Sequence, residues 1–400
     1  MKKNNTLWFF GGVLAGIILI MSANSVYRYI TTRIYIPAFG EMPVQSKIDA
    51  IYNVLDLYYV DDYDKNALMS RAYEGLVAGL GDPYSNYMEA SVFEDFLQHS
   101  EGTYEGIGVV VSVDINDNRI IVLVPYEGAP GARAGILPGD KIIKVDDVPV
   151  SGDMLDEAVS MMKGEPGTDV DVTIYRESDG SVFDVTITRA KISIPTVAHE
   201  LIDGDVGYIK ISVFDRVTAG QFKNSLDELR YRGMKGLILD LRDNPGGLLD
   251  VVVYITDMLV ACDYIVYTEN KHGEREYFYA DAERIEVPLV VLVNGRSASA
   301  SEILAGAVKD TGTGTLVGAT TFGKGLVQST FYLPDKSGVK TTIAKYYTPS
   351  GVCIDKEGIV PDYEVELPDE FKYSLSIPTE EDTQLQKAIE IIIREAAYVK

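Results

Sequence analysis

A serine stands where an apolar strand is expected to turn into a helix. Ser299 lies in Asn-Gly-Arg-Ser-Ala-Ser-Ala-Ser-Glu, residues 294–302, directly after the apolar run 290–293. At a helix start, free backbone N–H groups and the positive end of the helix dipole favour a developing oxyanion. Ser299 is therefore a candidate nucleophile. Ser299 and Glu302 also fit a capping box, so a purely structural role stays open.

A nucleophilic serine needs a base, and histidine is the usual one. The chain has only His99, His199 and His272, and all three precede Ser299. The Ser-Asp-His order of α/β-hydrolases is therefore excluded, and the G-x-S-x-G pattern of those enzymes is absent. His272 lies in a charged run that is typical of a solvated hairpin turn. The sequence disfavours a histidine-based triad.

Lys324 is the alternative base. Gly323 and Gly325 flank it, which allows close packing of the backbone and lets the side chain point inward. On an extended strand Gln328 would share its face and could hold the amine by hydrogen bonding. To act as a base, a lysine must lose about 3 units from its reference pKa near 10.4, roughly 4 kcal/mol, which burial can supply. A solvated turn lysine is the competing interpretation.

Two other patterns in this region resemble known motifs. Residues 318–325 match G-x-x-x-x-G-K, but Gly325 stands where a P-loop needs Ser or Thr, and a strand-like segment follows instead of a helix. Ser337 and Lys340 have the S-x-x-K spacing of penicillin-binding enzymes, but they fall in a predicted hairpin turn without a Ser-Asp-Asn partner. We therefore expect neither nucleotide binding nor that chemistry.

A third candidate element is a strand that leads through Asn-Pro-Gly-Gly into a helix, residues 239–247. Gly246 and Gly247 would allow the positive φ angles that such a turn requires. Backbone N–H groups gathered in the turn could supply a second oxyanion donor. A simple connecting turn explains the same residues.

Composition limits the classes of function. The chain has 400 residues, 46% of them hydrophobic, which suits two or three folded domains. The net charge of −24, without a basic run, disfavours a nucleic-acid partner. Cys262 and Cys353 are too few for a metal cage, and whether they form a disulfide stays open. We expect no cofactor and no metal.

The N-terminus predicts export. Lys2 and Lys3 precede an uncharged stretch, residues 4–27, that is about long enough to cross a bilayer with its flanks. The positive-inside rule then places the rest of the chain outside the cytoplasm. We expect a single-pass anchor in the cell membrane with the catalytic part extracytoplasmic. A cleaved signal peptide is the alternative, because small residues lie at 23–25.

The pattern of apolar residues divides the chain into regions. Residues 44–97 have helical spacing, 103–190 contain short β-type runs with one helix, and from about 205 strands alternate with helices. The fold class is therefore multidomain α+β, with an α/β core. We place the boundaries at 1–27 (anchor), 28–102 (tether and helical region), 103–190 (β-rich module), 191–370 (core) and 371–400 (C-terminal helical region).

The ordered set of these motifs resembles the carboxy-terminal processing proteases, also called tail-specific proteases, over residues 44–362. The resemblance implies a serine endopeptidase with a crotonase/ClpP-like core, in which Ser299 is the nucleophile, Lys324 the base and Gln328 its orienting residue. It implies an oxyanion hole from Ala300, Gly246 and Gly247. The sequence departs from the family pattern at Val352-Cys353, where relatives often carry an arginine, and Asp310 matches an acidic position that we expect to be structural.

The module at 103–190 is similar to PDZ domains. By that resemblance Gly106, Ile107, Gly108 and Val109 form the loop that receives the terminal carboxylate of a substrate tail. The expected partners are proteins with free C-terminal tails, and the family suggests that the module gates the active site and that a homodimer forms. An inactive PDZ scaffold that binds exported proteins is the alternative function.

Overall fold

The computed structural model describes residues 42–281, 285–371, 374 and 377–397, and the chain divides into two compact units after Leu68. The first unit contains α2 (Val44–Tyr58) and the beginning of α3 (Lys65–Ala78). Helix α2 buries none of its residues within the described chain, and Ile51, Val54 and Leu57 are exposed. The predicted anchor lies outside the described residues. Within them, no helix has both the length and the apolar character needed to span a bilayer.

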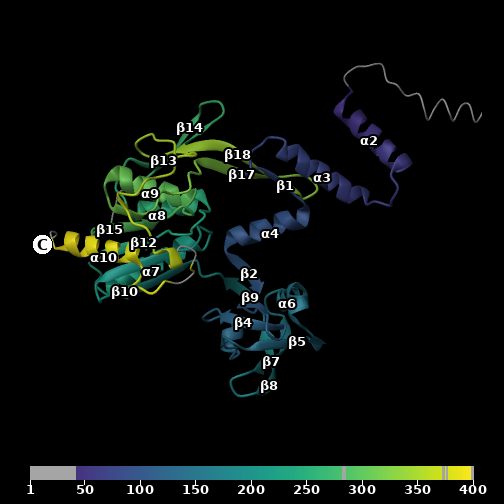
Figure 1. Ribbon diagram of the computed structural model, residues 1–400, viewed down its shortest axis with the longest axis horizontal. Helices are drawn as coiled ribbons and strands as arrows, with labels where there is room; N and C mark the ends of the chain where they lie inside the picture. Colours follow the sequence, from purple (N-terminus) through teal and green to yellow (C-terminus); the bar gives the residue numbers. More distant parts are fainter. Residues whose placement is uncertain (1–41, 282–284, 372–373, 375–376, 398–400) are drawn as a thin grey trace, which may run out of the picture. The chain divides into compact units, whose positions relative to one another are not determined.

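The second unit starts in α3 and continues through β1 (Asn86–Met88) and α4 (Ala90–Glu101) to a β-rich module (Figure 1). Strand β2 (Thr103–Gly106) enters the module and pairs with β9 (Ala190–Ser193), which leaves it. Between them runs a sheet in the order β3-β4-β5-β7-β8. Its strands are β3 (Val109–Asp114), β4 (Arg119–Pro125), β5 (Lys141–Val145), β7 (Asp169–Arg176) and β8 (Ser181–Thr188), with β6 (Val148–Pro149) paired to β5.

A small apolar core holds this module together. Alternate residues of β7, namely Val170, Val172 and Ile174, point into it because strand side chains alternate with period two. Helix α6 (Leu155–Met162) adds Ala158 and Met162. Two short helical turns, α5 (Pro130–Arg133) and η1 (Gly152–Met154), complete the module, which matches the prediction of a compact β-rich unit with one clear helix.

The α/β core is built on a six-stranded sheet in the order β10-β11-β12-β15-β16-β19. All neighbours pair in parallel except β10 with β11. The strands are β10 (Val197–Ile202), β11 (Val206–Ile211), β12 (Gly236–Asp240), β15 (Leu289–Val293), β16 (Thr315–Gly318) and β19 (Tyr363–Glu364). The predicted alternation of strands and helices is therefore confirmed for the core.

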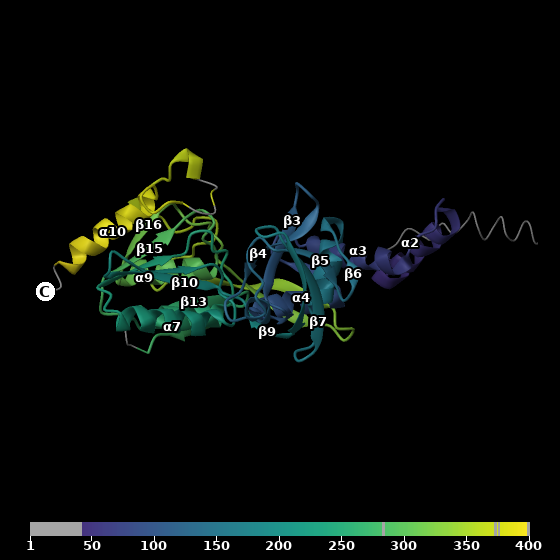
Figure 2. The same cartoon turned by 90° about the horizontal axis from the view of Figure 1, so that it is seen from below.

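Helices cover both faces of this sheet. One face packs against α7 (Thr218–Tyr231), α8 (Leu249–Asp257) and α9 (Ala300–Thr311), and the other against α10 (Thr383–Ala396). Figure 2 shows α7 and α10 on opposite sides of the strands. Strand β15 is buried on both faces of the sheet. Val291 packs on the side of α7, α8 and α9, and Val290 packs on the side of α10. A short turn, η2 (Asp369–Phe371), precedes α10.

A second sheet carries the segment that follows Lys324. Its order is β1-β18-β13-β14, and β17 also pairs with β18. The strands are β13 (Tyr264–Asn270), β14 (Arg275–Tyr279), β17 (Leu326–Tyr332) and β18 (Gly338–Tyr347). His272 lies in the β13–β14 turn and Ser337 in the β17–β18 turn, as predicted for both.

A buried ion-pair network fixes α10 to the end of β12. Arg242 lies 2.6 Å from Asp240 and 2.8 Å from Asp382, measured from its Nη2 atom to one carboxylate oxygen of each. Asp382 also caps α10 by accepting a hydrogen bond from the Leu385 N–H group. Burial opposes ionisation of Asp240, but the Arg242 guanidinium holds the pKa of that carboxyl below its usual value. The network therefore anchors the turn that starts at Asp243.

Candidate active site

Ser299 lies at the N-cap of α9, immediately beyond the carboxyl end of β15. Its backbone has φ 56° and ψ −114°, a conformation that L-residues adopt only when the surrounding structure imposes it. Gly246 presses against it, since a Cβ added there would lie 2.8 Å from the Ser299 Cβ atom. The sequence thus places the hydroxyl at a strained corner between strand and helix, as the motif predicted.

Asn244 connects the Asn-Pro-Gly-Gly turn to the serine loop. Its carbonyl oxygen accepts hydrogen bonds from the Ala298 N–H group at 3.0 Å and the Ser301 hydroxyl at 2.9 Å. Its side-chain oxygen accepts from the Gly246 N–H group at 2.8 Å. Asn244 itself is fully buried. These contacts hold the two loops of the site in one arrangement.

The three expected oxyanion donors are not equivalent. Ala300 is the first residue of α9, where a backbone N–H group has no acceptor within the helix. The Gly246 N–H group donates a hydrogen bond to the Asn244 side chain, and its role as an oxyanion donor stays a prediction. Gly247, with φ 146°, adjoins it in the same turn. We therefore keep Ala300 and Gly247 as the expected pair of donors.

Lys324 lies in the loop before β17 and is half-buried. Its Nζ atom is 4.5 Å from the centre of the Tyr84 ring. Burial, followed by the charge of Lys340, lowers the pKa of Lys324, while Asp82 and Glu302 oppose the shift. In the described part of the chain no carboxylate forms an ion pair with its amine. These surroundings favour the neutral amine that a general base requires.

Glu302 joins the serine loop to the lysine loop. Its fully buried carboxylate accepts hydrogen bonds from the backbone N–H groups of Ser299 at 2.8 Å and Lys324 at 2.8 Å. It also accepts from the Gly323 N–H group at 2.7 Å and the Thr321 hydroxyl at 2.6 Å. The predicted helix-capping contact from Ser299 is therefore present, but the same carboxylate also positions the proposed base.

Tyr346 makes a second connection between the two loops. Its hydroxyl lies 3.0 Å from the Ser299 carbonyl oxygen and also contacts the Lys324 carbonyl oxygen. The ring is buried, and burial raises the pKa of Tyr346 well above its ordinary value. The phenol therefore stays neutral and acts as a hydrogen-bond donor to the backbone of the site.

The position of Gln328 differs from the prediction in one respect. Strand β17 begins only at Leu326 and has an irregular register between Val327 and Gln328, so period-two alternation does not extend from Lys324 to Gln328. The Gln328 amide donates to the Leu326 carbonyl at 3.3 Å and the Thr342 hydroxyl at 3.4 Å. Gln328 still lines the same cleft as Lys324, but its amide group donates to Leu326 and Thr342 and not to the lysine.

Ser299 and Lys324 line one cleft of about 480 Å³. Helix α4 forms part of its wall through Phe96, Leu97, Ser100 and Glu101. Lys340 lines it from β18, with its Nζ atom 5.3 Å from the centre of the Phe96 ring. The cleft thus combines the candidate nucleophile, the candidate base and a second lysine.

Lys340 provides a test of the electrostatics. A positive charge near Lys324 disfavours its protonated form, so replacing Lys340 with Gln should raise the pKa of Lys324. Because a base works only when neutral, the acidic limb of the pH profile of kcat/KM should move to higher pH. The loss at neutral pH should be roughly two- to fivefold, as expected for a charge that is partly solvated.

Lys340→Arg is the matched control, since it keeps the charge and should leave the acidic limb in place. If the acidic limb of the kcat/KM profile keeps its position in Lys340→Gln, or moves to lower pH, Lys340 does not lower the pKa of Lys324.

Asp310 and the cysteines have no part in the cleft. The Asp310 carboxylate accepts a hydrogen bond from the Ser350 N–H group at 2.9 Å, which connects the end of α9 to the turn after β18. Cys262 and Cys353 are both free thiols. Over the described residues, no group of three or more His, Cys, Asp or Glu side chains is arranged to hold a metal ion.

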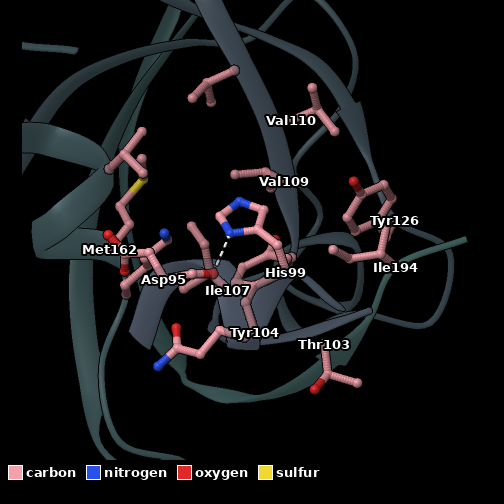
Figure 3. A pocket seen from close by; sticks show the side chains of 15 residues that line it. Asp95, His99, Thr103, Tyr104, Ile107, Val109, Val110, Tyr126, Met162 and Ile194 are labelled. Atoms are coloured by element: carbon pink, nitrogen blue, oxygen red, sulfur yellow. Dashed lines mark hydrogen bonds between the residues drawn. The ribbon is translucent and has the colours of Figure 1, made fainter. Parts of the chain in front are cut away.

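The predicted tail-binding loop lines a separate groove of about 300 Å³. Ile107, Gly108 and Val109 belong to its wall, together with Val159 and Met162 of α6 (Figure 3). Gly108 has φ 78°, and a Cβ there would lie 2.3 Å from the Ala129 Cβ atom. Gly106 belongs to β2 and is paired with Ala190, so it lies beside the groove and not in its lining.

Several residues of the site are not apparent from the sequence. Tyr84 contacts Lys324, and Asp82 accepts hydrogen bonds from the hydroxyls of Ser85 and Thr342, which fixes the 81–85 segment to β18. The segment reads Gly-Asp-Pro-Tyr-Ser, which is typical of a turn but does not indicate what the segment contacts. Nothing in the sequence pointed to Tyr346, and the Asn-Pro-Gly-Gly motif did not indicate that Asn244 connects the two loops of the site.

Comparisons with known proteins identify the family of this chain. Residues 205–365 match peptidase family S41, residues 121–176 match the PDZ domain, and residues 35–92 match the N-terminal domain of the activating protease CtpB. Carboxy-terminal processing protease CtpA of Bacillus subtilis (strain 168) is 38% identical over 325 residues, covering 81% of this chain and 69% of the relative.

Two further relatives have similar names. The carboxyl-terminal-processing protease of Synechocystis sp. (strain ATCC 27184 / PCC 6803 / Kazusa) is 36% identical, covering 87% of this chain and 84% of the relative. A solved structure of a photosystem II D1 C-terminal processing protease is 32% identical, with a TM-score of 0.47. The match covers 82% of this chain and 88% of that structure's chain. The chain belongs to the carboxy-terminal processing proteases of peptidase family S41.

Proposed function

We propose that this protein is a serine endopeptidase that cleaves proteins near their C-terminal tails with Ser299 as nucleophile and Lys324 as general base. One observation carries the proposal: both side chains line the same cleft, and the lysine is half-buried without an ion-pair partner among the described residues. A passive scaffold would have no use for a desolvated amine beside a strained serine.

The proposed reaction proceeds in two steps. The neutral Lys324 amine takes the proton of the Ser299 hydroxyl while the oxygen attacks the scissile carbonyl carbon. The oxyanion of the tetrahedral intermediate accepts hydrogen bonds from the N–H groups of Ala300 and Gly247. Lys324 then donates the proton to the leaving amine, and the C–N bond breaks. Water, activated by the same amine, hydrolyses the acyl ester and regenerates Ser299.

The groove in the β-rich module is the proposed tail receptor. Strand β3 is the terminal strand of its sheet, so its outer edge can pair with an extended peptide, as in β-strand addition. Residues Ile107, Gly108 and Val109 would receive the terminal carboxylate through backbone N–H groups. The apolar lining then favours an apolar C-terminal side chain.

Helix α4 supports a gating role for the module. Asp95, Gln98 and His99 of this helix line the tail groove, while Phe96 and Ser100 line the catalytic cleft. A tail that shifts α4 would therefore change the wall of the cleft. We place the gate on this helix, because it is shared by both sites.

Export completes the proposal. Residues 4–27 would anchor the chain in the cell membrane, with residues 28–102 as tether and helical region, 103–190 as PDZ-like domain, 191–370 as protease core and 371–400 as C-terminal region. Helix α2 exposes Ile51, Val54 and Leu57, which suits burial in a homodimer. The substrates would be exported or membrane proteins with accessible tails.

The test uses an unstructured reporter protein made in two forms, with a free terminal carboxylate and with a carboxamide. The free form should be cleaved near its tail, and the amide should be cleaved at least tenfold more slowly, because its terminus cannot be bound as an anion. The Ser299→Ala variant, which lacks the proposed nucleophile, measures the background cleavage. Equal cleavage of both forms would refute tail recognition, and cleavage by Ser299→Ala would refute the nucleophile.

A further inference from the structure

The tail groove has a wall that does not come from the β-rich module. Most of its lining is apolar and comes from that module, such as Val109, Val111 and Met162. Helix α4, which precedes the module, contributes Asp95, Gln98 and His99. Figure 3 shows the His99 imidazole projecting into the groove between Val109 and Met162.

The hydrogen bonding of His99 determines what its free nitrogen can do. Its Nδ1 atom lies 2.7 Å from the Asp95 carbonyl oxygen. A carbonyl oxygen only accepts, so Nδ1 must carry the proton. In the neutral ring the other nitrogen, Nε2, is then a hydrogen-bond acceptor. The backbone of α4 therefore sets the ring as an acceptor in a mostly apolar groove.

The His99 imidazole lies beside the edge of β3, where a substrate tail would pair as an additional strand. Strand β3 begins at Val109 and is the terminal strand of its sheet. In Figure 3 the nitrogen not bonded to Asp95 is on the side of Val109. A peptide paired with β3 would carry alternate side chains toward α4 and α6. One of these side chains would then meet His99.

We infer that His99 is a specificity-determining residue that accepts a hydrogen bond from a hydroxyl side chain, Ser or Thr, of the substrate tail. The inference rests on the proposed tail recognition. A hydroxyl is the donor that fits best, because it is small and uncharged. The charged group of a lysine or arginine would have to lose its hydration among Ile107, Val109 and Met162, with Asp95 as the single carboxylate of the lining, and the Lys peptides of the test measure this alternative.

The test measures binding of fluorescent tail peptides to the full chain carrying Ser299→Ala, which prevents cleavage. Each of the last four positions is set in turn to Thr, Val or Lys, in peptides with a free carboxylate. Thr and Val have nearly the same shape, so their affinity ratio isolates the hydroxyl. At one position Thr should bind about five- to tenfold more tightly than Val, the effect of one hydrogen bond.

Variants of α4 complete the test. His99→Phe keeps a ring but removes the acceptor, so the Thr/Val ratio should fall to about one or below. Glu94→Gln, on the same helix but outside the groove lining, should keep the wild-type ratio. A ratio unchanged in His99→Phe, or a preference for Lys over Thr, overturns the inference alone. Failure of every free-carboxylate peptide to bind overturns tail recognition and the inference with it.

Discussion

Replacing Lys324 with Met is expected to lower kcat/KM for an unstructured protein substrate about 10⁴-fold while the chain stays folded. Methionine has nearly the length of lysine but no amine, so Ser299 keeps its place and loses its base. The half-buried position beside Tyr84 should accept an apolar side chain without loss of stability, because the lysine is desolvated there. Cleavage of casein and thermal unfolding measure the two effects.

Two comparisons sharpen this result. Ser299→Ala should cause a loss of similar size, and the double variant should be no worse than either single one, because the two groups act as one unit. Lys324→Arg should be as inactive as Lys324→Met, since a guanidinium stays protonated at neutral pH. Activity within tenfold of the wild type in Lys324→Met would show that another group removes the serine proton.

The pH dependence has a defined sign. A base with a lowered pKa is protonated at low pH, so kcat/KM should rise with pH as Lys324 loses its proton and then level off. Burial among neighbours such as Tyr84 moves this rise to lower pH than an exposed lysine would give. The pH profile of kcat/KM therefore reports the base, and the change of this profile in Lys340→Gln reports the effect of the Lys340 charge.

Local structure could be predicted from the sequence wherever it depends only on neighbouring residues. The strand at 289–293 was predicted from its continuous apolar run, and the turn at Gly246 and Gly247 and the serine at a helix start were predicted from turn and capping residues. These features need no knowledge of distant parts of the chain. The alternation of strands and helices in the core was predictable for the same reason.

Contacts between distant segments were not readable. Ser85 and Thr341 are 256 positions apart, yet their hydroxyls lie 3.1 Å from each other, and this contact helps to place Tyr84 under the base. The expectation for Gln328 assumed a regular strand from residue 324, but the strand starts at Leu326 and is irregular at Val327. Tertiary pairing sets where a strand begins, and single-sequence periodicity does not contain it.

Glu302 joins local and distant effects. From the sequence it is the N3 residue of a capping box, since Ser299 lies three positions before it. Its other partners, Thr321, Gly323 and Lys324, lie 19 to 22 positions later and surround the same carboxylate. One buried side chain thus fixes the backbone of both proposed catalytic residues, and this makes it the second large target for substitution.

Replacing Glu302 with Gln should lower kcat about 10²- to 10³-fold, with a much smaller change in KM, and should destabilise the fold by about 2–4 kcal/mol. A carboxylate accepts on both oxygens, but an amide turns one of them into a donor. The amide NH₂ must then face either the N–H groups of Ser299 and Lys324 or the Thr321 hydroxyl and the Gly323 N–H group. Steady-state kinetics and urea unfolding measure the two effects.

Glu357→Gln is the matched control, because it makes the same change of charge on an exposed side chain near the lysine loop. It should alter neither kcat nor stability. Thr321→Val, which removes one donor and leaves the carboxylate in place, should lower kcat only several-fold. If Glu302→Gln lost stability but kept wild-type kcat in its folded fraction, the carboxylate would hold the fold together without positioning Ser299 against Lys324. The loss of kcat is expected because a displacement of about 1 Å between nucleophile and base is enough to reduce the rate about a hundredfold.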